Sequence, residues 1–221
     1  MTIHIDEDNP LIGIGFGKMV AFLLIYFILW NGLIPFLNLI SNYYLYADYM
    51  PLIMGIPLLI SLLLFPSIRN KAIIAFSFNA FKQYNTYIAI ILGFFLILFS
   101  EKIIFLNGIF ISDGMRVIYE NDLFLATKPL IWYLLTIFFS PIWEEVFYRV
   151  ILFGWINGKL GVWIAAIASS TLFGVVHGDY PVFAGIMGLV FLLIYRYSNS
   201  ILPAILLHSL WNTFIFIREY F

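Results

Sequence analysis

Apolar runs long enough to cross a membrane recur along the whole chain, and they constrain its fold more than any other feature. A helix needs about 20 apolar residues to cross the hydrocarbon core of a bilayer, which is about 30 Å thick. Of the 221 residues, 63% are apolar and only 10% are charged, whereas a soluble domain is about half apolar and a quarter charged. A soluble chain of this size would expose much of that apolar surface to water. The sequence therefore predicts an integral, multi-pass membrane protein.

About seven runs fit a helical crossing, so the predicted fold is an all-α, polytopic transmembrane helical bundle. The segment Ser67–Phe81 would raise the number of spans to eight, but its clustered charges favour a helix lying at the membrane interface. The polar stretch Asn107–Lys128 is expected to form an outer loop or a lid. The seven runs are Gly17–Ile40, Tyr49–Pro66, Thr86–Leu106, Pro129–Ile156, Gly161–His177, Pro181–Tyr195 and Ile201–Ile217.

Positive charges predict the orientation of the bundle, because short loops rich in Lys and Arg tend to stay in the cytoplasm. With a cytoplasmic N-terminus, Arg116, Lys128 and Arg218 fall on the outer side. The cations on the cytoplasmic side are then Lys18, Arg69, Lys71, Lys82, Lys159 and Arg196.

Charge and cysteine content exclude several classes of function. The net charge is −1, so the chain lacks the basic field that nucleic-acid binding requires. It contains no cysteine, which removes disulfides, thiolate catalysis and Cys-ligated metal sites together.

A cluster of charged residues lies deep in the fourth run, in the segment Ser140-Pro-Ile-Trp-Glu144-Glu145-Val-Phe-Tyr-Arg149. A charged residue inside a span costs about 2.5–3.5 kcal/mol on insertion scales, so it indicates a functional site by default. Glu145 and Arg149 are four residues apart on one helix face and can neutralise each other, as a purely structural pair would. Glu144 is turned about 100° away from Glu145 and needs a different partner.

Two further polar clusters contain histidines. Phe173-Gly-Val-Val-His177 ends the fifth run, and His208-Ser-Leu-Trp-Asn212 lies in the last run. Each cluster alone also fits a structural role, as an interfacial histidine or an interhelical hydrogen bond. The chain has three histidines, and only His4 lies outside these clusters. Because the helical rise places the three clusters at similar depths, we expect them to share one site.

A carboxylate, two imidazoles and an amide in a water-poor cavity suit amide hydrolysis. A carboxylate can take a proton from water, and neutral donors can hold the developing oxyanion. The same groups suit one divalent metal, Zn²⁺ before others, with Glu144, His177 and His208 as its ligands. The residue types leave both chemistries open, so the prediction is either no cofactor or one divalent metal, with Zn²⁺ favoured among the metals.

The three motifs taken together resemble a known family. Glu-Glu-x-x-x-Arg, then Phe-x-x-x-His about thirty residues later, then His-x-x-x-Asn in a late span, is similar to the CPBP family of intramembrane proteases, also called the Abi family. That family includes the type II CAAX prenyl endopeptidases and bacterial proteins linked to bacteriocin processing and self-immunity. The resemblance covers about Pro129–Ile217. We therefore divide the chain into residues 1–128, which hold spans without a recognised motif, and residues 129–221, which hold a CPBP-like catalytic core.

The resemblance implies a role for each motif residue. Glu144 activates the attacking water, and His177 orients that water or binds a metal. His208 and Asn212 stabilise the oxyanion.

The remaining motif members are implied to support these four. Glu145 and Arg149 form a supporting pair, in agreement with their helical spacing, and Phe173 is a packing residue of the second motif.

The function expected from this resemblance is that of an intramembrane endopeptidase in the bilayer. Its substrates would be membrane-associated proteins or peptide precursors, through CAAX-type processing or through processing of bacteriocin or pheromone peptides linked to self-immunity. The richness in Ile, Phe and Asn is typical of an AT-rich bacterial genome and indicates a bacterial plasma membrane. The alternatives are a non-enzymatic membrane immunity or scaffold protein, and a transporter that relays ions through its buried polar groups. The lack of a detectable inverted repeat disfavours the transporter.

Overall fold

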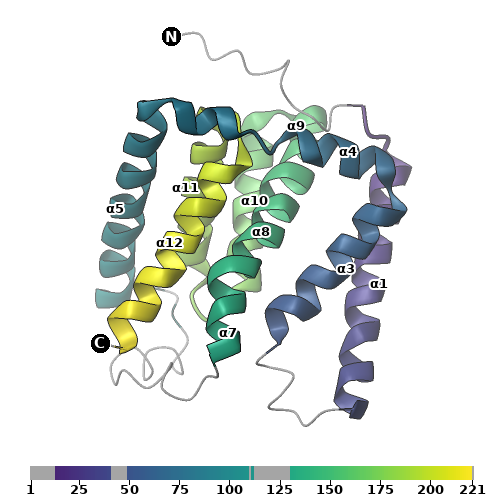
Figure 1. Cartoon of the computed structure of the whole chain (residues 1–221), viewed down its shortest axis with the longest axis horizontal. Coiled ribbons are helices and arrows are strands. Elements are labelled where there is room, and N and C mark those ends of the chain that lie inside the picture. The colour runs from purple at the N-terminus through teal and green to yellow at the C-terminus, as the bar shows by residue number, and fades with distance from the viewer. Residues whose placement is uncertain (1–12, 41–48, 110, 112–129, 221) are drawn as a thin grey trace.

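The computed structural model describes residues 13–40, 49–109, 111 and 130–220, and all regular elements in these residues are helices (Figure 1). Most of the predicted loop Asn107–Lys128 lies outside the described residues, as does His4. The expectation of an all-α, polytopic bundle is confirmed.

The helices follow the predicted apolar runs closely. A long continuous helix comprises α7 (Leu130–Leu134), the π-helical turns η2 (Leu135–Phe139), α8 (Ser140–Glu145), the π-helical η3 (Val146–Phe153) and α9 (Gly154–Leu160). The other elements are α1 (Phe16–Ile40), α3 (Met50–Leu64), α4 (Pro66–Ile74), the 3₁₀ helix η1 (Phe78–Lys82), α5 (Tyr84–Leu106), α10 (Val162–Val176), α11 (Pro181–Ser198) and α12 (Ile201–Tyr220).

Five of these helices are long and apolar enough to cross a membrane by themselves. They are Phe16–Pro35, Tyr84–Leu106, Leu130–Leu160, Pro181–Ser198 and Ile201–Arg218. The apolar helix α10 has 15 residues and at about 1.5 Å per residue is shorter than a typical hydrocarbon core. The seven predicted runs are thus all helical, but only five pass as independent spans, or six if α3 and the bent segment after it count as one.

The segment after α3 turns sharply and crosses one end of the bundle. The direction of the chain changes by 110° between Met50–Leu64 and Pro66–Lys82, at Pro66, which starts α4 where a proline costs no helical hydrogen bond. The predicted single helix over Ser67–Phe81 is instead α4 followed by η1. Figure 1 shows this segment running across the top of the molecule from α3 towards α5.

Hydrogen bonds from Ser200 hold this crossing segment on the C-terminal half of the chain. The Ser200 hydroxyl donates to the Ser77 carbonyl at 2.8 Å and accepts from the Ser77 amide at 3.2 Å. The Ile201 amide donates to the Ala75 carbonyl at 2.8 Å. The crossing segment is therefore fixed to the turn between α11 and α12, where Asn199 adopts the left-handed conformation that ends α11.

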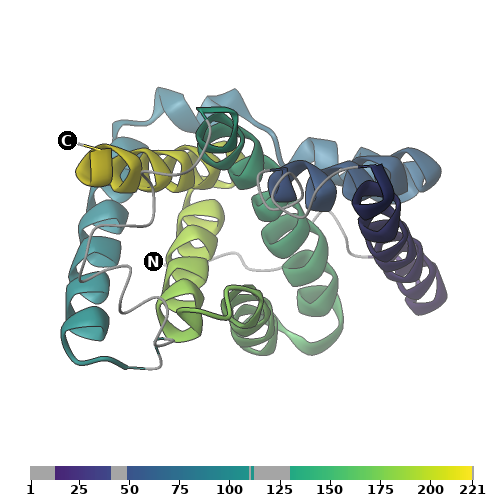
Figure 2. The same ribbon diagram turned by 90° about the horizontal axis from the view of Figure 1, so that it is seen from below.

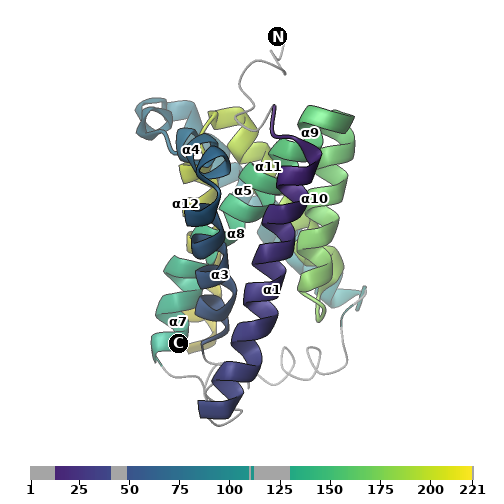
Figure 3. The same ribbon diagram turned by 90° about the vertical axis from the view of Figure 1, so that its right-hand side faces the viewer.

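Helix α11 lies at the centre of the helices that surround the polar clusters. It packs against α10, α5 and α12, and Figure 2 shows these helices around it, with α1 at the far edge. In Figure 3, α1 is in front, beside α3, which is the helix it contacts most. Small residues permit the tightest of these contacts, because a Cβ atom on Gly174 would collide with the backbone carbonyl of Pro181.

Replacing Gly174 by Ala should separate α10 from α11 and destabilise the fold. The added methyl group meets backbone rather than a mobile side chain, and overpacking of this kind costs about 1–3 kcal/mol. We expect less monodisperse protein after detergent extraction and a lower melting temperature. Gly178→Ala is the matched control, because nothing lies within 4 Å of the added methyl group. Equal stability of the two variants would contradict this account of the helix contact.

Candidate active site

The long helix Leu130–Leu160 positions the first cluster, and two stretches of π-helix interrupt its α-helical geometry. η2 ends just before Pro141, whose missing N–H breaks the normal hydrogen-bond ladder. η3 starts just after Glu145. Extra residues per turn shift the direction of side chains relative to an ideal α-helix, and π turns are frequent at functional sites. The two glutamates thus lie on a short α-helical stretch between two π-helical ones.

Glu145 and Arg149 form a fully buried ion pair, as their spacing predicts. Arg149 Nε lies 3.0 Å from Glu145 Oε2, and the two side chains are 1% and 0% exposed. The guanidinium also donates to the Gly188 carbonyl at 3.2 Å and lies 4.3 Å from the ring centre of Phe173. A side chain on Gly188 would come within 3.3 Å of that guanidinium. The cation is therefore neutralised by one carboxylate and held by α10 and α11.

The second oxygen of Glu145 orients His208. Oε1 of Glu145 lies 3.0 Å from Nδ1 of His208. Since a carboxylate paired with Arg149 is an acceptor, Nδ1 of His208 carries the proton that it donates. The imidazole also stacks on Phe191, with ring centres 4.6 Å apart and an interplanar angle of 17°. His208 is thus held in one orientation, with Nε2 directed away from Glu145.

His177 is oriented by the backbone of its own helix. Its Nδ1 lies 2.7 Å from the carbonyl oxygen of Phe173, which can only accept, so Nδ1 carries the proton. This carbonyl is available because α10 ends at Val176. The ring lies 4.5 Å from the ring of Phe173 and 5.8 Å from that of Tyr180. Burial, reinforced by the charge of Glu144, raises the pKa of Tyr180 to about 12, so this neighbouring phenol stays protonated.

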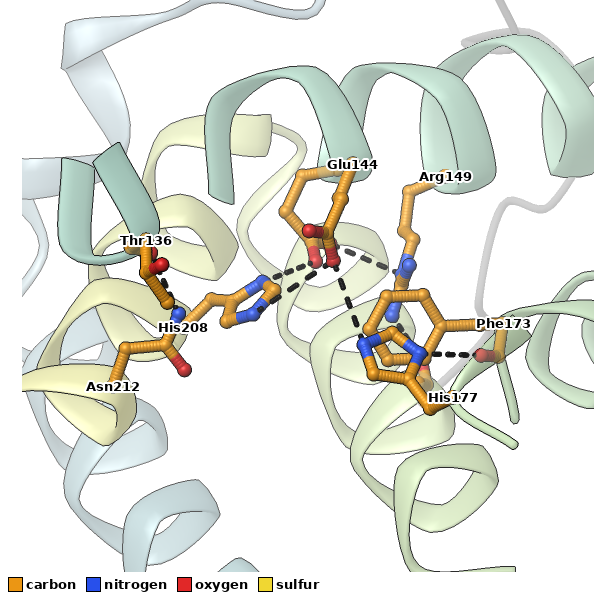
Figure 4. Close-up of polar contacts among 9 residues, drawn as sticks. Thr136, Glu144, Arg149, Phe173, His177, His208 and Asn212 are labelled. Atoms are coloured by element: carbon orange, nitrogen blue, oxygen red, sulfur yellow. Dashed lines mark hydrogen bonds and ion pairs between the residues drawn. The ribbon is translucent and has the colours of Figure 1, made fainter. Parts of the chain in front are cut away.

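The two imidazoles meet at Glu144, which answers the prediction that this residue needs a partner other than Arg149. Oε2 of Glu144 lies 4.0 Å from Nε2 of His177 and 4.0 Å from Nε2 of His208. Figure 4 shows both rings directed at this carboxylate. The Glu144 side chain is 9% exposed, and within the described part of the protein its Oε2 has no hydrogen-bond partner. Three acceptor atoms, Oε2 of Glu144 and the two imidazole Nε2 atoms, therefore lie near one another. A molecule that donates hydrogen bonds could bind between them.

Asn212 lies one helical turn beyond His208. Its amide nitrogen donates to the carbonyl of Thr136 at 2.9 Å. This carbonyl lies in the π-helical stretch η2. The contact ties α12 to the long helix about two turns before the glutamates (Figure 4). The structure thus brings Glu144, His177 and His208 together around one atom, with Asn212 at the edge of the group.

The arrangement does not match a preformed zinc site. Ligand atoms at about 2.0–2.1 Å from a tetrahedral zinc ion are about 3.4 Å from one another, whereas both imidazole nitrogens lie 4.0 Å from the carboxylate oxygen. In the residues that the structure describes, no group of three or more His, Asp or Glu side chains is placed to hold a metal ion. The expected ligand set Glu144, His177 and His208 therefore finds no support in this geometry.

The structure also shows partners that the sequence did not reveal. Gly188 and Phe191 of α11, Thr136 of η2 and Tyr180 contact motif residues directly. Gly188 follows Ala184 by four residues, a spacing of small residues that indicates close helix packing. Phe191 is one of 24 phenylalanines, and no local pattern distinguishes it from the others.

Comparison with known proteins identifies the class of this site. Residues 126–214 match the family described as type II CAAX prenyl endopeptidase Rce1-like. The match covers the part of the chain that carries all three motifs, and there it confirms the resemblance to the CPBP family of membrane proteases.

Two curated bacterial proteins are similar to the chain over about 140 residues. One is named "Putative membrane peptidase YdiL", from Bacillus subtilis, and is 30% identical over 137 residues, which are 58% of this chain and 54% of that protein. The other is named "Membrane-embedded CAAX protease MroQ", from Staphylococcus aureus, and is 27% identical over 140 residues, 58% of this chain and 56% of that protein. The chain thus spans about half the length of the curated relatives it matches. No solved structure matches it.

Removing the guanidinium of Arg149 should unfold much of the protein. Arg149→Ala leaves the Glu145 carboxylate buried without its cation, and breaking a buried pair costs about 3–5 kcal/mol. We expect a strong loss of folded protein by size-exclusion chromatography in detergent. Lys159→Ala serves as the control, because Lys159 is exposed at the end of α9. Normal accumulation of Arg149→Ala would contradict the structural role given to this pair.

Proposed function

We propose that this protein is an intramembrane endopeptidase that hydrolyses peptide bonds with a water activated by Glu144. The observation that carries the proposal is the buried oxygen Oε2 of Glu144, which lies 4.0 Å from the Nε2 atoms of both His177 and His208. A separation of this size exceeds a direct hydrogen bond and is one that a bridging molecule can span. One water placed between these atoms can donate its two protons to two of the three acceptors at a time.

Glu144 acts as the general base in this mechanism. Its carboxylate takes a proton as the water oxygen attacks the scissile carbonyl carbon, and the same proton then passes to the leaving amine. His177 orients the water, because the hydrogen bond from Nδ1 to the Phe173 carbonyl leaves Nε2 as an acceptor that faces Glu144. The surrounding apolar helices exclude bulk water, which strengthens these electrostatic interactions.

His208 and Asn212 stabilise the oxyanion. His208 can donate from Nε2 only when both ring nitrogens carry protons, since Nδ1 already donates to Glu145. The Glu145 carboxylate, itself paired with Arg149, accepts from Nδ1 of His208 and so fixes the direction in which Nε2 points. Asn212 adds an amide donor on the same face of α12. Glu145 and Arg149 therefore act as positioning residues.

The substrates that fit this site are peptide segments at the membrane. Membrane-associated proteins and peptide precursors both bring a peptide bond to a site buried among spanning helices. The name of the Staphylococcus aureus relative, a membrane-embedded CAAX protease, agrees with a substrate of this kind. A bacterial plasma membrane is the compartment we propose for the reaction.

Glu144→Gln should abolish cleavage while leaving the fold intact. The amide has the same shape but cannot accept the proton, and loss of a general base costs about 10²–10⁴-fold in rate. Wild type and variant would be expressed at matched levels, and peptide termini in membranes and medium compared by mass spectrometry. Lys102→Gln is the control, because Lys102 is exposed on α5 and its loss should leave every cleavage unchanged.

Identical peptide profiles for wild type and Glu144→Gln, with both proteins folded, would overturn the protease proposal. The protein would then be better described as a membrane immunity or scaffold protein. In that case protection of the cell against a bacteriocin should survive Glu144→Gln and His177→Gln alike.

The proposed mechanism predicts that zinc chelators leave activity unchanged. The donor atoms around Glu144 lie farther apart than zinc ligands do, and the glutamate mechanism requires only water. Purified protein would be incubated with a chelator, desalted and assayed on a peptide identified in the cell comparison, with a known zinc protease as positive control. Loss of activity on chelation with recovery on added zinc would assign Glu144, His177 and His208 to a metal instead.

A further inference from the structure

Ser170 of α10 carries a buried hydroxyl that the proposed reaction does not use. The residue is 7% exposed, and its Oγ has no hydrogen-bond partner in the part of the chain that the structure describes. A serine inside a helix commonly donates to the carbonyl three or four residues earlier. The neighbouring Ser169 does so, to Ala166 at 3.4 Å. Because Ser170 makes no such bond, its hydroxyl is available to a partner on another helix.

The guanidinium of Arg149 also has a polar atom without a partner. Its Nε lies 3.0 Å from Oε2 of Glu145, and its Nη2 donates to the Gly188 carbonyl at 3.2 Å. Nη1 is buried, and no acceptor for it lies among the described residues. This nitrogen carries two N–H donors, and a donor of a charged group is costly to leave unpaired among apolar helices. An acceptor for Nη1 would therefore stabilise the buried cation.

Arg149 and Ser170 meet at Gly188 of α11. A Cβ atom on Gly188 would lie 3.3 Å from Nη2 of Arg149 and 3.4 Å from Cα of Ser170. Phe173, three residues after Ser170 and on the same face of α10, has its ring centre 4.3 Å from the guanidinium carbon. One face of α10 thus covers the guanidinium with an aromatic ring and places the Ser170 hydroxyl beside it.

A water molecule fits the polar atoms of this contact. The described residues show no direct hydrogen bond between Ser170 and Arg149. Water commonly bridges buried polar groups that do not touch, and it does so with two to four hydrogen bonds. Nη1 supplies donors, and the Ser170 hydroxyl supplies both a donor and acceptor lone pairs. A water between them can therefore accept from the guanidinium and donate to the serine.

We infer that one buried water joins Nη1 of Arg149 to Oγ of Ser170, which makes Ser170 a positioning residue of the site. All three nitrogens of the guanidinium then have an acceptor. Arg149 holds Glu145, and Glu145 in turn holds His208. The effect of Ser170 on catalysis rests on the proposed protease function, in which His208 stabilises the oxyanion, whereas the water site itself does not.

Thermal unfolding in detergent tests the link between the two residues. Ser170→Ala removes only the hydroxyl, and we expect the melting temperature to fall by about 2–4 °C, as for the loss of one hydrogen bond in a protein of this size. Arg149→Lys keeps the charge but removes Nη1. In that background, Ser170→Ala should cause little further fall, because the partner of the hydroxyl is already gone. Ser169→Ala is the matched control and should have the same effect in both backgrounds.

Equal falls from Ser170→Ala in the two backgrounds would overturn the inference, because the two residues would then act independently. If Arg149→Lys does not fold, a crystal structure of the wild type that resolves ordered waters decides instead. We expect density for a water within hydrogen-bond distance of both Nη1 and Oγ. Density without that water, or a direct contact between the two side chains, would overturn the inference. Neither measurement involves proteolysis, so its failure is separate from failure of the proposed function.

The positioning role is tested by kinetics on a peptide whose cleavage is lost in Glu144→Gln cells. We expect Ser170→Ala to lower kcat about 3- to 10-fold with KM unchanged, because His208 acts on the transition state rather than on substrate binding. Ser169→Ala should match the wild type. An unchanged kcat for Ser170→Ala would overturn the positioning role. The absence of any cleavage that depends on Glu144 would overturn the protease proposal, and with it the positioning role.

Discussion

The buried chain of charges from Arg149 through Glu145 to His208 is the interaction on which the rest of the structure depends. A guanidinium that is 1% exposed is tolerated among apolar helices because a carboxylate neutralises it and a backbone carbonyl accepts a hydrogen bond from it. The carboxylate lies on the long helix, the carbonyl lies on α11, and His208 of α12 contacts the same carboxylate. This chain of contacts therefore fixes how the long helix, α11 and α12 lie together. The orientation of His208 follows from the same contact.

Sequence patterns predicted this chain of interactions in part. The spacing of Glu145 and Arg149 implied a pair, and the 100° offset of Glu144 implied separate surroundings, in which its Oε2 lies 4.0 Å from both imidazoles. Both features follow from the period of one helix. The seven apolar runs likewise appear as helices, since backbone groups in a bilayer have few other ways to be satisfied.

Other features depend on packing between helices and left no local signal. The carbonyl that orients His177 is free because α10 ends at Val176, and the hydrophobicity pattern placed that end only approximately. The stacking of Phe191 on His208 requires knowing how α11 is rotated against α12. The π-helical stretches on either side of the glutamates change the direction of side chains without changing composition. Residue types suggested a set of metal ligands. Whether their donor atoms lie close enough together to bind one ion depends on helix packing, which the sequence does not show.

The hydrogen bonds of Ser200 to Ser77 bear on how the two parts of the chain can be studied. The division at residue 128 marks where motifs begin, yet α5 and the crossing segment, both before it, pack against α11 and α12 after it. A fragment restricted to 129–221 would lose the partners of Ser200 and expose to lipid or detergent the faces of α11 and α12 that α5 covers. Cooperative unfolding of the two parts is the expected behaviour, and the first half acts as a scaffold for the motif-bearing half in spite of having no motif of its own.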